Sequence, residues 1–370
     1  MPAYLGAWYN AVMSAPIPAL STDIRPRVDQ LLNEAMRRGA SDLHVEPAAH
    51  GFDLRFRIDG QLQNLEQLDT ATGKAVVGRL MVMAHLLTYR LDVPQEGRIS
   101  LPDQAELRIA VMPTSHGLRA AVRLPMPHMQ QAKLATLGLP PGVLQTLEQF
   151  CRADSGMLVL TGPAGSGKTT TIYALLQAMG AQENGLSIIT LEDPIERDLP
   201  GVTQIEVSPF GQLTYEKALR SLLRQDPQVL MLGEIRDAQT ASLAVQATLS
   251  GHRLITTFHA STPGGAIARL LEMGIEPYQV TSALWAVVSQ RLVRRSKPGG
   301  GYEGRMPLAE VVKIDSPLRA AILNRSDART LQGIYRDQSG YQSLFDVGEK
   351  LLAQGETDLT ELHRVIGDNS

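Results

Sequence analysis

The residues with the clearest chemical meaning form a glycine-rich loop near the middle of the chain. Gly162–Thr169 matches the pattern G-x-x-x-x-G-K-S/T, and it stands between a short apolar run and a helix-forming stretch, the context that this pattern requires. Glycines let backbone N–H groups turn toward phosphate oxygens, and the positive end of the following helix adds to the attraction. The pattern predicts a triphosphate site made of Gly162, Pro163, Ala164, Gly165, Ser166, Gly167, Lys168, Thr169 and Thr170.

Two residues of this loop have distinct expected roles. Lys168 should reach the β and γ phosphates, and the hydroxyl of Thr169 should ligate Mg²⁺. The expected cofactors are therefore ATP and Mg²⁺. A plain glycine-rich turn between a strand and a helix is the alternative interpretation.

Polar side chains follow three later apolar runs. Glu192 and Asp193 end the first run, Glu234 follows the second, and His259 ends the third. Ligands in open α/β sheets bind beyond the carboxyl ends of the strands, so these groups should meet at the loop. Hydrolysis needs a carboxylate that orients or deprotonates water. We assign that role to Glu234, the Mg²⁺ shell or the attacking water to Glu192, and sensing of the γ-phosphate to His259.

Each of these assignments has a structural alternative. An acid at a strand end can cap the next helix, and His259 can be a structural histidine. Gly233 stands before Glu234, where many P-loop enzymes carry a metal-binding aspartate. The Mg²⁺ ion would then depend on Thr169 and on acids elsewhere, of which Glu192 is our candidate.

The elements that must position these residues alternate in the second half of the chain. Short apolar runs at 157–160, 188–191, 229–232 and 254–257 alternate with helical stretches at 170–179, 215–223 and 238–249. Such alternation is typical of a parallel sheet with crossover helices. We therefore expect an α/β nucleotide-binding domain over 151–370. Its part after a Lys/Pro/Gly-rich loop at 296–304 should be mostly helical.

The first half has a different texture. Apolar residues at helical spacing over 26–38 end at Gly39, and Phe52, Leu54, Phe56 and Ile58 alternate with charged residues before an Asp59–Gly60 turn. A second hairpin is predicted around His116–Gly117. Residues 25–125 thus predict a small α+β domain, and the proline-containing segment 126–150 predicts a linker.

Composition limits the class of protein. The 370 residues carry a net charge of −3 and a single cysteine, Cys151, so nothing global favours nucleic acid, and neither an internal disulfide nor a cysteine zinc site is possible. No apolar run approaches the roughly 18 residues of a membrane span. Residues 1–24 predict a flexible lead-in. We expect a cytoplasmic protein without a covalent membrane anchor.

These segments together resemble the ATPases of type II secretion, type IV pilus assembly and competence systems. The matching stretches are the loop at 162–173, ITLEDPIE at 189–196, LRQDPQVLMLGEIRD at 223–237 and the histidine-containing segment at 246–274. Further matches in the first half are SDLHVEP at 41–47, RFRIDG at 55–60, QEGRI at 95–99 and LRIA at 107–110.

The resemblance implies a RecA-like P-loop core preceded by a small α+β domain of PAS-like type. It implies a hexameric ring, ATP bound between domains, and an inner-membrane platform protein as partner, with the motor peripheral to that membrane. It also implies that Arg108 and Arg123 complete the phosphate site, and Arg98 and Arg119 are weaker candidates. Arginines of this kind neutralise transition-state charge, although a solvated strand face is the alternative.

The chain departs from the family pattern at its amino-terminal side, where assembly ATPases usually carry a further domain. It also lacks the cysteines of a zinc subdomain over 293–301. Three other functions stay open: a pilus retraction ATPase, a DNA-handling P-loop motor, and an ATP-binding regulatory or scaffold protein with little turnover.

Overall fold

A computed structural model describes residues 23–101, 106–125, 133–181, 185–208 and 211–367. The predicted lead-in, apart from its last two residues, and the first part of the predicted linker lie outside this description. The chain divides into two compact units, Met1–Pro127 and His128–Ser370.

The described residues of the first unit form one antiparallel sheet and two helices. The six strands have the order β3-β2-β1-β6-β5-β4. Their bounds are β1 (Asp42–Ala48), β2 (Gly51–Ile58), β3 (Gln61–Leu68), β4 (Gln95–Ser100), β5 (Glu106–Thr114) and β6 (Gly117–Arg123). The helices are α2 (Ile24–Arg37) and α3 (Thr70–Met83). Both predicted hairpins, β2–β3 and β5–β6, are confirmed.

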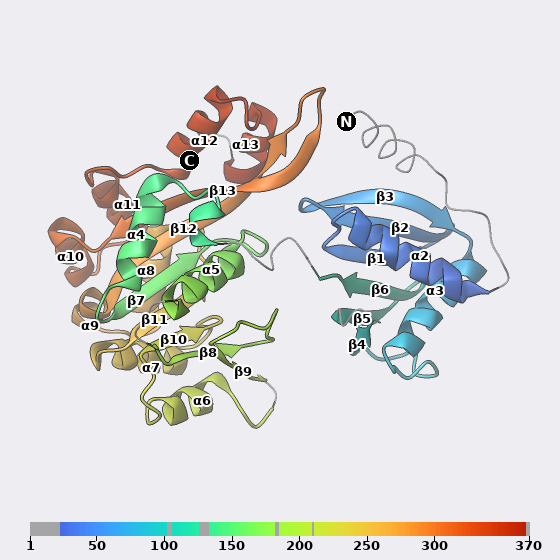
Figure 1. The fold of residues 1–370 in the computed structure, drawn as a ribbon, viewed down its shortest axis with the longest axis horizontal. Helices are drawn as coiled ribbons and strands as arrows, with labels where there is room; N and C mark the ends of the chain where they lie inside the picture. The colour runs from blue at the N-terminus through green and yellow to red at the C-terminus, as the bar shows by residue number, and fades with distance from the viewer. Residues whose placement is uncertain (1–22, 102–105, 126–132, 182–184, 209–210, 368–370) are drawn as a thin grey trace. The chain divides into compact units, whose positions relative to one another are not determined.

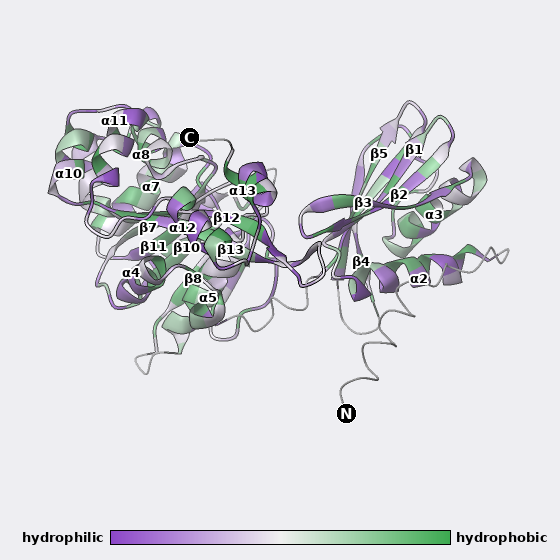
Figure 2. Ribbon diagram, turned by 90° about the horizontal axis from the view of Figure 1, so that it is seen from above, coloured by the Kyte–Doolittle hydropathy of each residue, from purple (hydrophilic) through white to green (hydrophobic). Residues whose placement is uncertain are grey.

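Alternation along the strands decides which face of this sheet is covered. Leu43 and Val45 of β1 and Leu54 of β2 are buried in one cluster with the apolar faces of α2 and α3. Residues with the opposite parity, most of them charged, lie on the other face because successive side chains of a strand alternate. The helix α2 is amphipathic, as its alternating colours in Figure 2 show, and Asp23 caps its first turn through Arg25 N.

The second unit contains a mostly parallel sheet. Its described strands are β7 (Gly156–Thr161), β8 (Ile188–Glu192), β9 (Thr203–Glu206), β10 (Val229–Leu232), β11 (Arg253–Phe258), β12 (Leu284–Ser296) and β13 (Tyr302–Lys313). The strand order is β13-β12-β7-β11-β10-β8-β9. Only the pairing of β12 with β13 is antiparallel among these described strands. The four predicted runs are confirmed as β7, β8, β10 and β11.

Helices cover both faces of this sheet, which gives three layers (Figure 1). A 3₁₀ helix, η2 (Leu134–Thr136), with α4 (Pro141–Cys151) and α5 (Lys168–Gly180), packs on one face. The other face packs against α6 (Tyr215–Leu222), α7 (Ala238–Leu249), α8 (Pro263–Glu272), α9 (Pro277–Ala283), α10 (Ser316–Leu323) and α11 (Ala328–Arg336). Helices α12 (Leu344–Ala353) and α13 (Leu359–Ile366) pack against β12 and β13. The central strand β7 is buried along its whole length.

One expectation about the end of the chain is wrong in part. The segment after residue 304 is not helical at first, because β13 continues to Lys313 and pairs with β12 over most of its length. Helices follow only from α10 onward. Within the described residues, no helix is long and apolar enough to cross a membrane.

Candidate nucleotide site

The phosphate loop connects the central strand β7 to α5. Gly162 has a φ of 146° and Gly167 has a φ of 87°. Residues other than glycine rarely adopt such positive φ values. A Cβ atom on Gly162 would lie 2.4 Å from the carbonyl oxygen of Gln290, so this position has no room for a side chain. Pro163, Ala164 and Gly165 are exposed at the tip of the loop.

Lys168 begins α5 and folds back over the loop. Its Nζ atom donates hydrogen bonds to the carbonyl oxygens of Gly162 at 2.8 Å and Pro163 at 2.9 Å. Burial lowers the pKa of Lys168, the nearby Arg291 lowers it further, and Glu234 acts in the opposite direction. Thr169 and Thr170 are half-buried in the first turn of α5.

Ser166 supplies an observation that fits an absent anion. Its Oγ atom is buried and has no hydrogen-bond partner in the part of the chain that the structure describes. A buried hydroxyl without a partner is costly, and a phosphate oxygen bound in the loop would accept a hydrogen bond from it. The loop therefore fits a bound phosphate.

Strand register brings the other candidate residues to the same edge. Thr161 of β7 pairs with Phe258 of β11, and Leu232 of β10 pairs with Leu191 of β8. The residues that follow these positions are Gly162, His259, Gly233 and Glu192, so four neighbouring parallel strands end side by side. The loop and the sequence-predicted acids thus share the carboxyl edge of the sheet.

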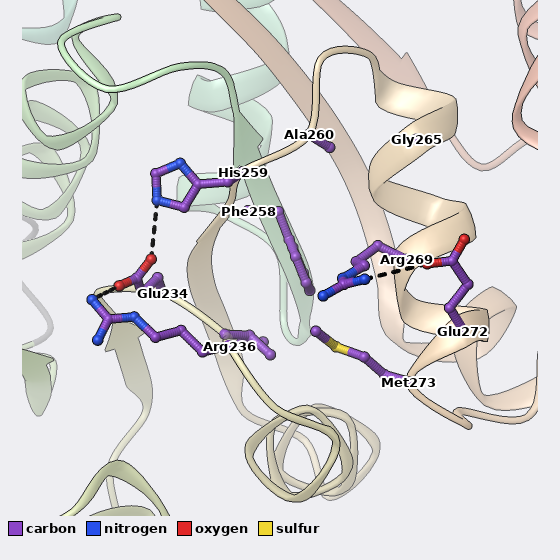
Figure 3. A pocket seen from close by; sticks show the side chains of 10 residues that line it. Glu234, Arg236, Phe258, His259, Ala260, Gly265, Arg269, Glu272 and Met273 are labelled. Carbon is purple, nitrogen blue, oxygen red and sulfur yellow. Dashed lines mark hydrogen bonds and ion pairs between the residues drawn. The ribbon is translucent and has the colours of Figure 1, made fainter. Parts of the chain in front are cut away.

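Glu234 is held from two sides at this edge (Figure 3). Its Oε2 atom lies 3.1 Å from Nε2 of His259, and its Oε1 atom pairs with the guanidinium of Arg236. Arg236 also lies 3.6 Å from Asp193. The cavity beside this cluster has a volume of about 330 Å³ and continues toward Arg269 and Glu272 of α8. His259 and Arg236 thus hold the Glu234 carboxylate in one orientation at this edge, as the role of a base requires.

Gly233 has a physical reason to be glycine. A Cβ atom at this position would lie 2.7 Å from the hydroxyl oxygen of Tyr215 in α6. Burial, and then the charge of Asp193, raise the pKa of Tyr215, so this phenol stays neutral. Tyr215 therefore occupies the space that an aspartate side chain at position 233 would need.

Glu192 ends β8 as a deeply buried carboxylate, 3% exposed. Its Oε1 atom accepts hydrogen bonds from Thr190 Oγ1 at 2.6 Å and Gln204 Nε2 at 3.0 Å, and Oε2 accepts one from the hydroxyl of Tyr173. Burial and this hydrogen bond raise the pKa of Tyr173 above its usual range. The three donors fix the orientation of the Glu192 carboxylate. Its Oε2 atom accepts only one of these hydrogen bonds and can accept one more.

Four arginines of the first unit lie in a cross-strand row on the polar face of its sheet. Pairing joins Arg57 of β2 to Asp42, Asp42 to Arg123, Arg123 to Arg108, and Arg108 to Arg98. We call Arg57, Arg123, Arg108 and Arg98 the arginine row. Its four guanidinium groups share the line with one carboxylate, that of Asp42. Arg123 is 72% exposed and lies 3.4 Å from Asp42.

Two weaker candidates are committed to other contacts. Arg119 donates to Glu46 at 2.8 Å and contacts His44 Nδ1 at 3.0 Å. Arg98 lies 3.3 Å from Glu106. No group of three or more His, Cys, Asp or Glu side chains suited to a metal ion occurs among the residues whose placement is described.

Sequence reasoning missed three residues that shape the site. Arg236 was overlooked although it stands two residues after Glu234, and an arginine so close to a catalytic candidate was a readable signal. Tyr173 and Gln290 gave no such signal: Tyr173 stands between the apolar residues Ile172 and Ala174, and Gln290 lies more than a hundred positions after the phosphate loop. Only the tertiary structure brings them to the site.

Comparison with known proteins gives consistent similarities. The family described as type II/IV secretion system protein matches residues 20–364. The chain is 38% identical to the type II secretion system protein HxcR of Pseudomonas aeruginosa, over 92% of this chain and 77% of that protein. It is 34% identical to the type IV pilus assembly ATPase PilB of Thermus thermophilus, over 90% of this chain and 42% of that protein.

Among solved structures, the chain is similar to the pilus retraction motor PilT crystallised with ADP. The TM-score is 0.66 at 26% identity, and the match covers 90% of this chain and 95% of the PilT chain. This similarity confirms the predicted fold class, a RecA-like P-loop core with a preceding domain.

Proposed function

The chain belongs to the type II/IV secretion system protein family, and we propose that it is a Mg²⁺-dependent ATPase that drives type II protein secretion or type IV pilus assembly. The observation that carries this proposal is the position of Glu234. Its carboxylate is held by His259 and Arg236 at the strand-end edge, where its charge also acts on Lys168 of the phosphate loop.

The residues of the loop suit the binding of a nucleoside triphosphate. The backbone N–H groups of the loop residues other than Pro163, together with the start of α5, suit an anion site. Lys168 adds a mobile positive charge for the β and γ phosphates. Its present acceptors are two loop carbonyls, and a phosphate is the stronger acceptor for an ammonium group.

The oxygen atoms near the loop also fit Mg²⁺. This ion takes one or two protein oxygens, keeps several waters and uses phosphate oxygens for the rest. Thr169 at the start of α5 would hold it, and Glu192 has acceptor capacity left on Oε2 for a metal-bound water. When bound, the ion neutralises negative charge on the phosphates.

Glu234 would act as the base that orients or deprotonates the attacking water. His259 at 3.1 Å and Arg236 keep this carboxylate in one orientation, so the orienting contacts exist before the nucleotide arrives. His259 also has an exposed ring, which suits a role in sensing the γ-phosphate.

Steady-state ATP hydrolysis by the purified chain tests this proposal. We expect turnover by the wild type that Glu234→Gln reduces by about a hundredfold or more, because the amide cannot take a proton from water. Equal rates for the two proteins would contradict the catalytic assignment. Negligible turnover by the wild type would instead favour a regulatory or scaffold protein that binds ATP.

We further propose that the chain works as a hexameric ring at the cytoplasmic face of the inner membrane, on a platform protein of a secretion or pilus system. The names of two relatives, a type II secretion system protein and a type IV pilus assembly ATPase, support the link to such a system, and the ring and the platform protein are what the family resemblance implies. If sites are shared between subunits, activity per subunit should rise with protein concentration as rings form. Full activity of a dilute monomer would contradict shared sites.

Secretion or assembly is preferred here to pilus retraction. HxcR and PilB, to which the chain is 38% and 34% identical, are a type II secretion system protein and a type IV pilus assembly ATPase, which supports secretion or assembly. A DNA-handling motor is disfavoured by the net charge of −3, because motors that track nucleic acid carry basic surfaces.

A further inference from the structure

Gln290 is the buried side chain most closely engaged with the phosphate loop outside the loop itself. It lies on β12, which pairs in parallel with β7, and it is 2% exposed. Nothing in the sequence pattern assigns it a role. A primary amide buried in a strand is unfavourable unless both of its ends are bonded, and here both ends are.

The two ends of the Gln290 amide join two parts of the nucleotide site. Its Nε2 atom donates to the carbonyl oxygen of Ser166 at 2.9 Å. Its Oε1 atom accepts from Thr171 Oγ1 at 2.9 Å. Ser166 belongs to the loop and Thr171 to the first turn of α5, so a single side chain ties the loop to the helix that follows it.

The bond to Ser166 also determines where a loop N–H points. Because the peptide between Ser166 and Gly167 is planar and trans, its C=O and N–H groups point in opposite directions. With the Ser166 carbonyl turned toward Gln290, the N–H of Gly167 is turned away from Gln290. A Cβ on Gly167 would lie 2.7 Å from Nε2 of Gln290, so a side chain at position 167 would displace the amide from its place.

We propose that Gln290 is a positioning residue for nucleotide binding: its amide sets the orientation of the Ser166–Gly167 peptide and thereby presents loop N–H groups to the phosphates. This inference rests on the proposed function, since it presumes that the loop binds a nucleotide. Gln290 acts through the loop and is not itself a ligand. It has the effect of preorganisation, which lowers the cost of ordering the loop on binding.

The strand of Gln290 is itself anchored next to the site. Arg291 donates to the carbonyl oxygen of Gln290 at 2.9 Å and to that of Ser261 at 2.8 Å. Ser261 lies two residues after His259, in the segment between β11 and α8. The Gln290–Arg291 pair therefore connects the phosphate loop to the segment that carries His259.

The test compares equilibrium binding of ADP and ATP to the full chain by calorimetry. Gln290→Met keeps the length of the side chain and removes both hydrogen bonds. We expect nucleotide affinity to fall about tenfold, while the thermal unfolding midpoint without nucleotide changes little and kcat at saturating ATP stays within about threefold of wild type.

A matched control comes from the adjacent residue. Ser289 lies on the same strand, is fully buried, and its Oγ has no hydrogen-bond partner in the described part of the chain. Ser289→Ala should leave affinity unchanged. Thr171→Val removes the second end of the bridge and should weaken binding less than Gln290→Met does.

The pH dependence of nucleotide affinity in Gln290→Glu distinguishes a positioning role from a purely structural one. An ionised carboxylate repels the Ser166 carbonyl, whereas a protonated one can donate to it. The affinity deficit relative to wild type should therefore shrink as pH falls from about 8 to about 5. If wild type and Gln290→Met bind nucleotide equally, or if Ser289→Ala weakens binding as much, the inference is wrong. Failure of the wild type to bind nucleotide would instead contradict the proposed function.

Discussion

Nε2 of His259 lies 3.1 Å from Oε2 of Glu234, and these two residues follow neighbouring parallel strands. The opposite oxygen of the same carboxylate pairs with Arg236. Each oxygen of Glu234 thus has its own cationic or hydrogen-bonding neighbour. A base held in this way keeps its orientation without help from the substrate.

The contact between His259 and Glu234 predicts a specific loss on mutation. His259→Ala should reduce hydrolysis about tenfold to a hundredfold, because Glu234 loses one of the groups that orient it. ATP binding should change little. The double variant His259→Ala/Glu234→Gln should be no slower than Glu234→Gln alone, since the histidine acts through the carboxylate. Fully additive losses in kcat would contradict that coupling.

Lys168 and Glu234 should separate binding from chemistry. Lys168→Ala removes the charge that meets the β and γ phosphates and should abolish measurable nucleotide binding. Glu234→Gln should bind ATP as well as wild type does and fail to hydrolyse it. Fluorescent-nucleotide titration distinguishes the two variants. If Lys168→Ala bound nucleotide as tightly as wild type, Lys168 would not be part of the phosphate site.

The arginine row of the first unit makes a prediction about catalysis rather than stability. We propose that Arg108 and Arg123 supply charge to the phosphates. Arg108→Gln and Arg123→Gln should each lower kcat at least about tenfold, because an arginine acting on the transition state is worth that much or more. Arg123 is well exposed, so the unfolding midpoint should hardly move.

A matched control for the arginine row is Arg25. It forms an exposed pair with Asp23 at 2.9 Å at the start of α2. Arg25→Gln removes the same charge from the same unit and should leave kcat unchanged. An equal loss of activity in Arg25→Gln would mean that overall charge, and not the row, is responsible.

The elements that carry the site follow from local sequence patterns. The alternation from Phe52 to Ile58 predicts the half-buried strand β2, and the apolar run at 157–160 predicts β7, which is buried on both faces. The edge at which Glu192, Glu234 and His259 meet also follows, because the carboxyl ends of parallel strands lie at the same edge of a sheet. These inferences need only periodicity and the direction of the chain.

Features that depend on long-range pairing could not be predicted in the same way. The stretch Leu308–Val312 contains alanine and glutamate and suits a helix as well as a strand, and only its pairing with Val287–Arg291 makes it part of β13. The hydrogen bonds of Gln290 to Ser166 and Thr171 span more than a hundred positions. No local pattern contains that information.

A buried ion cluster holds α13 against β12. Glu361 is 0% exposed and accepts hydrogen bonds from the Nε atoms of Arg294 at 2.9 Å and Arg364 at 2.7 Å. Burial acts to raise the pKa of Glu361, but the hydrogen bonds from Arg364 and Arg294 outweigh it and lower the pKa to about 2 from an ordinary value of 4.5. The guanidinium of Arg294 also stacks on the ring of Tyr302 at 3.8 Å.

A depressed pKa of this kind fixes the sign of the pH dependence. The stabilising contribution of Glu361 is fully present above pH 4.5 and is lost as pH falls through about 2. Its size follows from the shift and is roughly 3 kcal/mol. Glu361→Gln should therefore lower the free energy of unfolding by about that amount near neutral pH, because the guanidinium groups of Arg294 and Arg364 lose their buried counter-charge.

Urea unfolding of the nucleotide-free chain at a series of pH values measures this effect. The difference between wild type and Glu361→Gln should be constant from neutral pH down to about 5 and should narrow below that. Glu356→Gln is the control, because Glu356 pairs with Arg295 at 3.2 Å on the surface of the same region. Such exposed pairs contribute about 0.5 kcal/mol or less. A difference for Glu361→Gln that widened toward low pH would show that the carboxylate is not held in its charged form by Arg294 and Arg364.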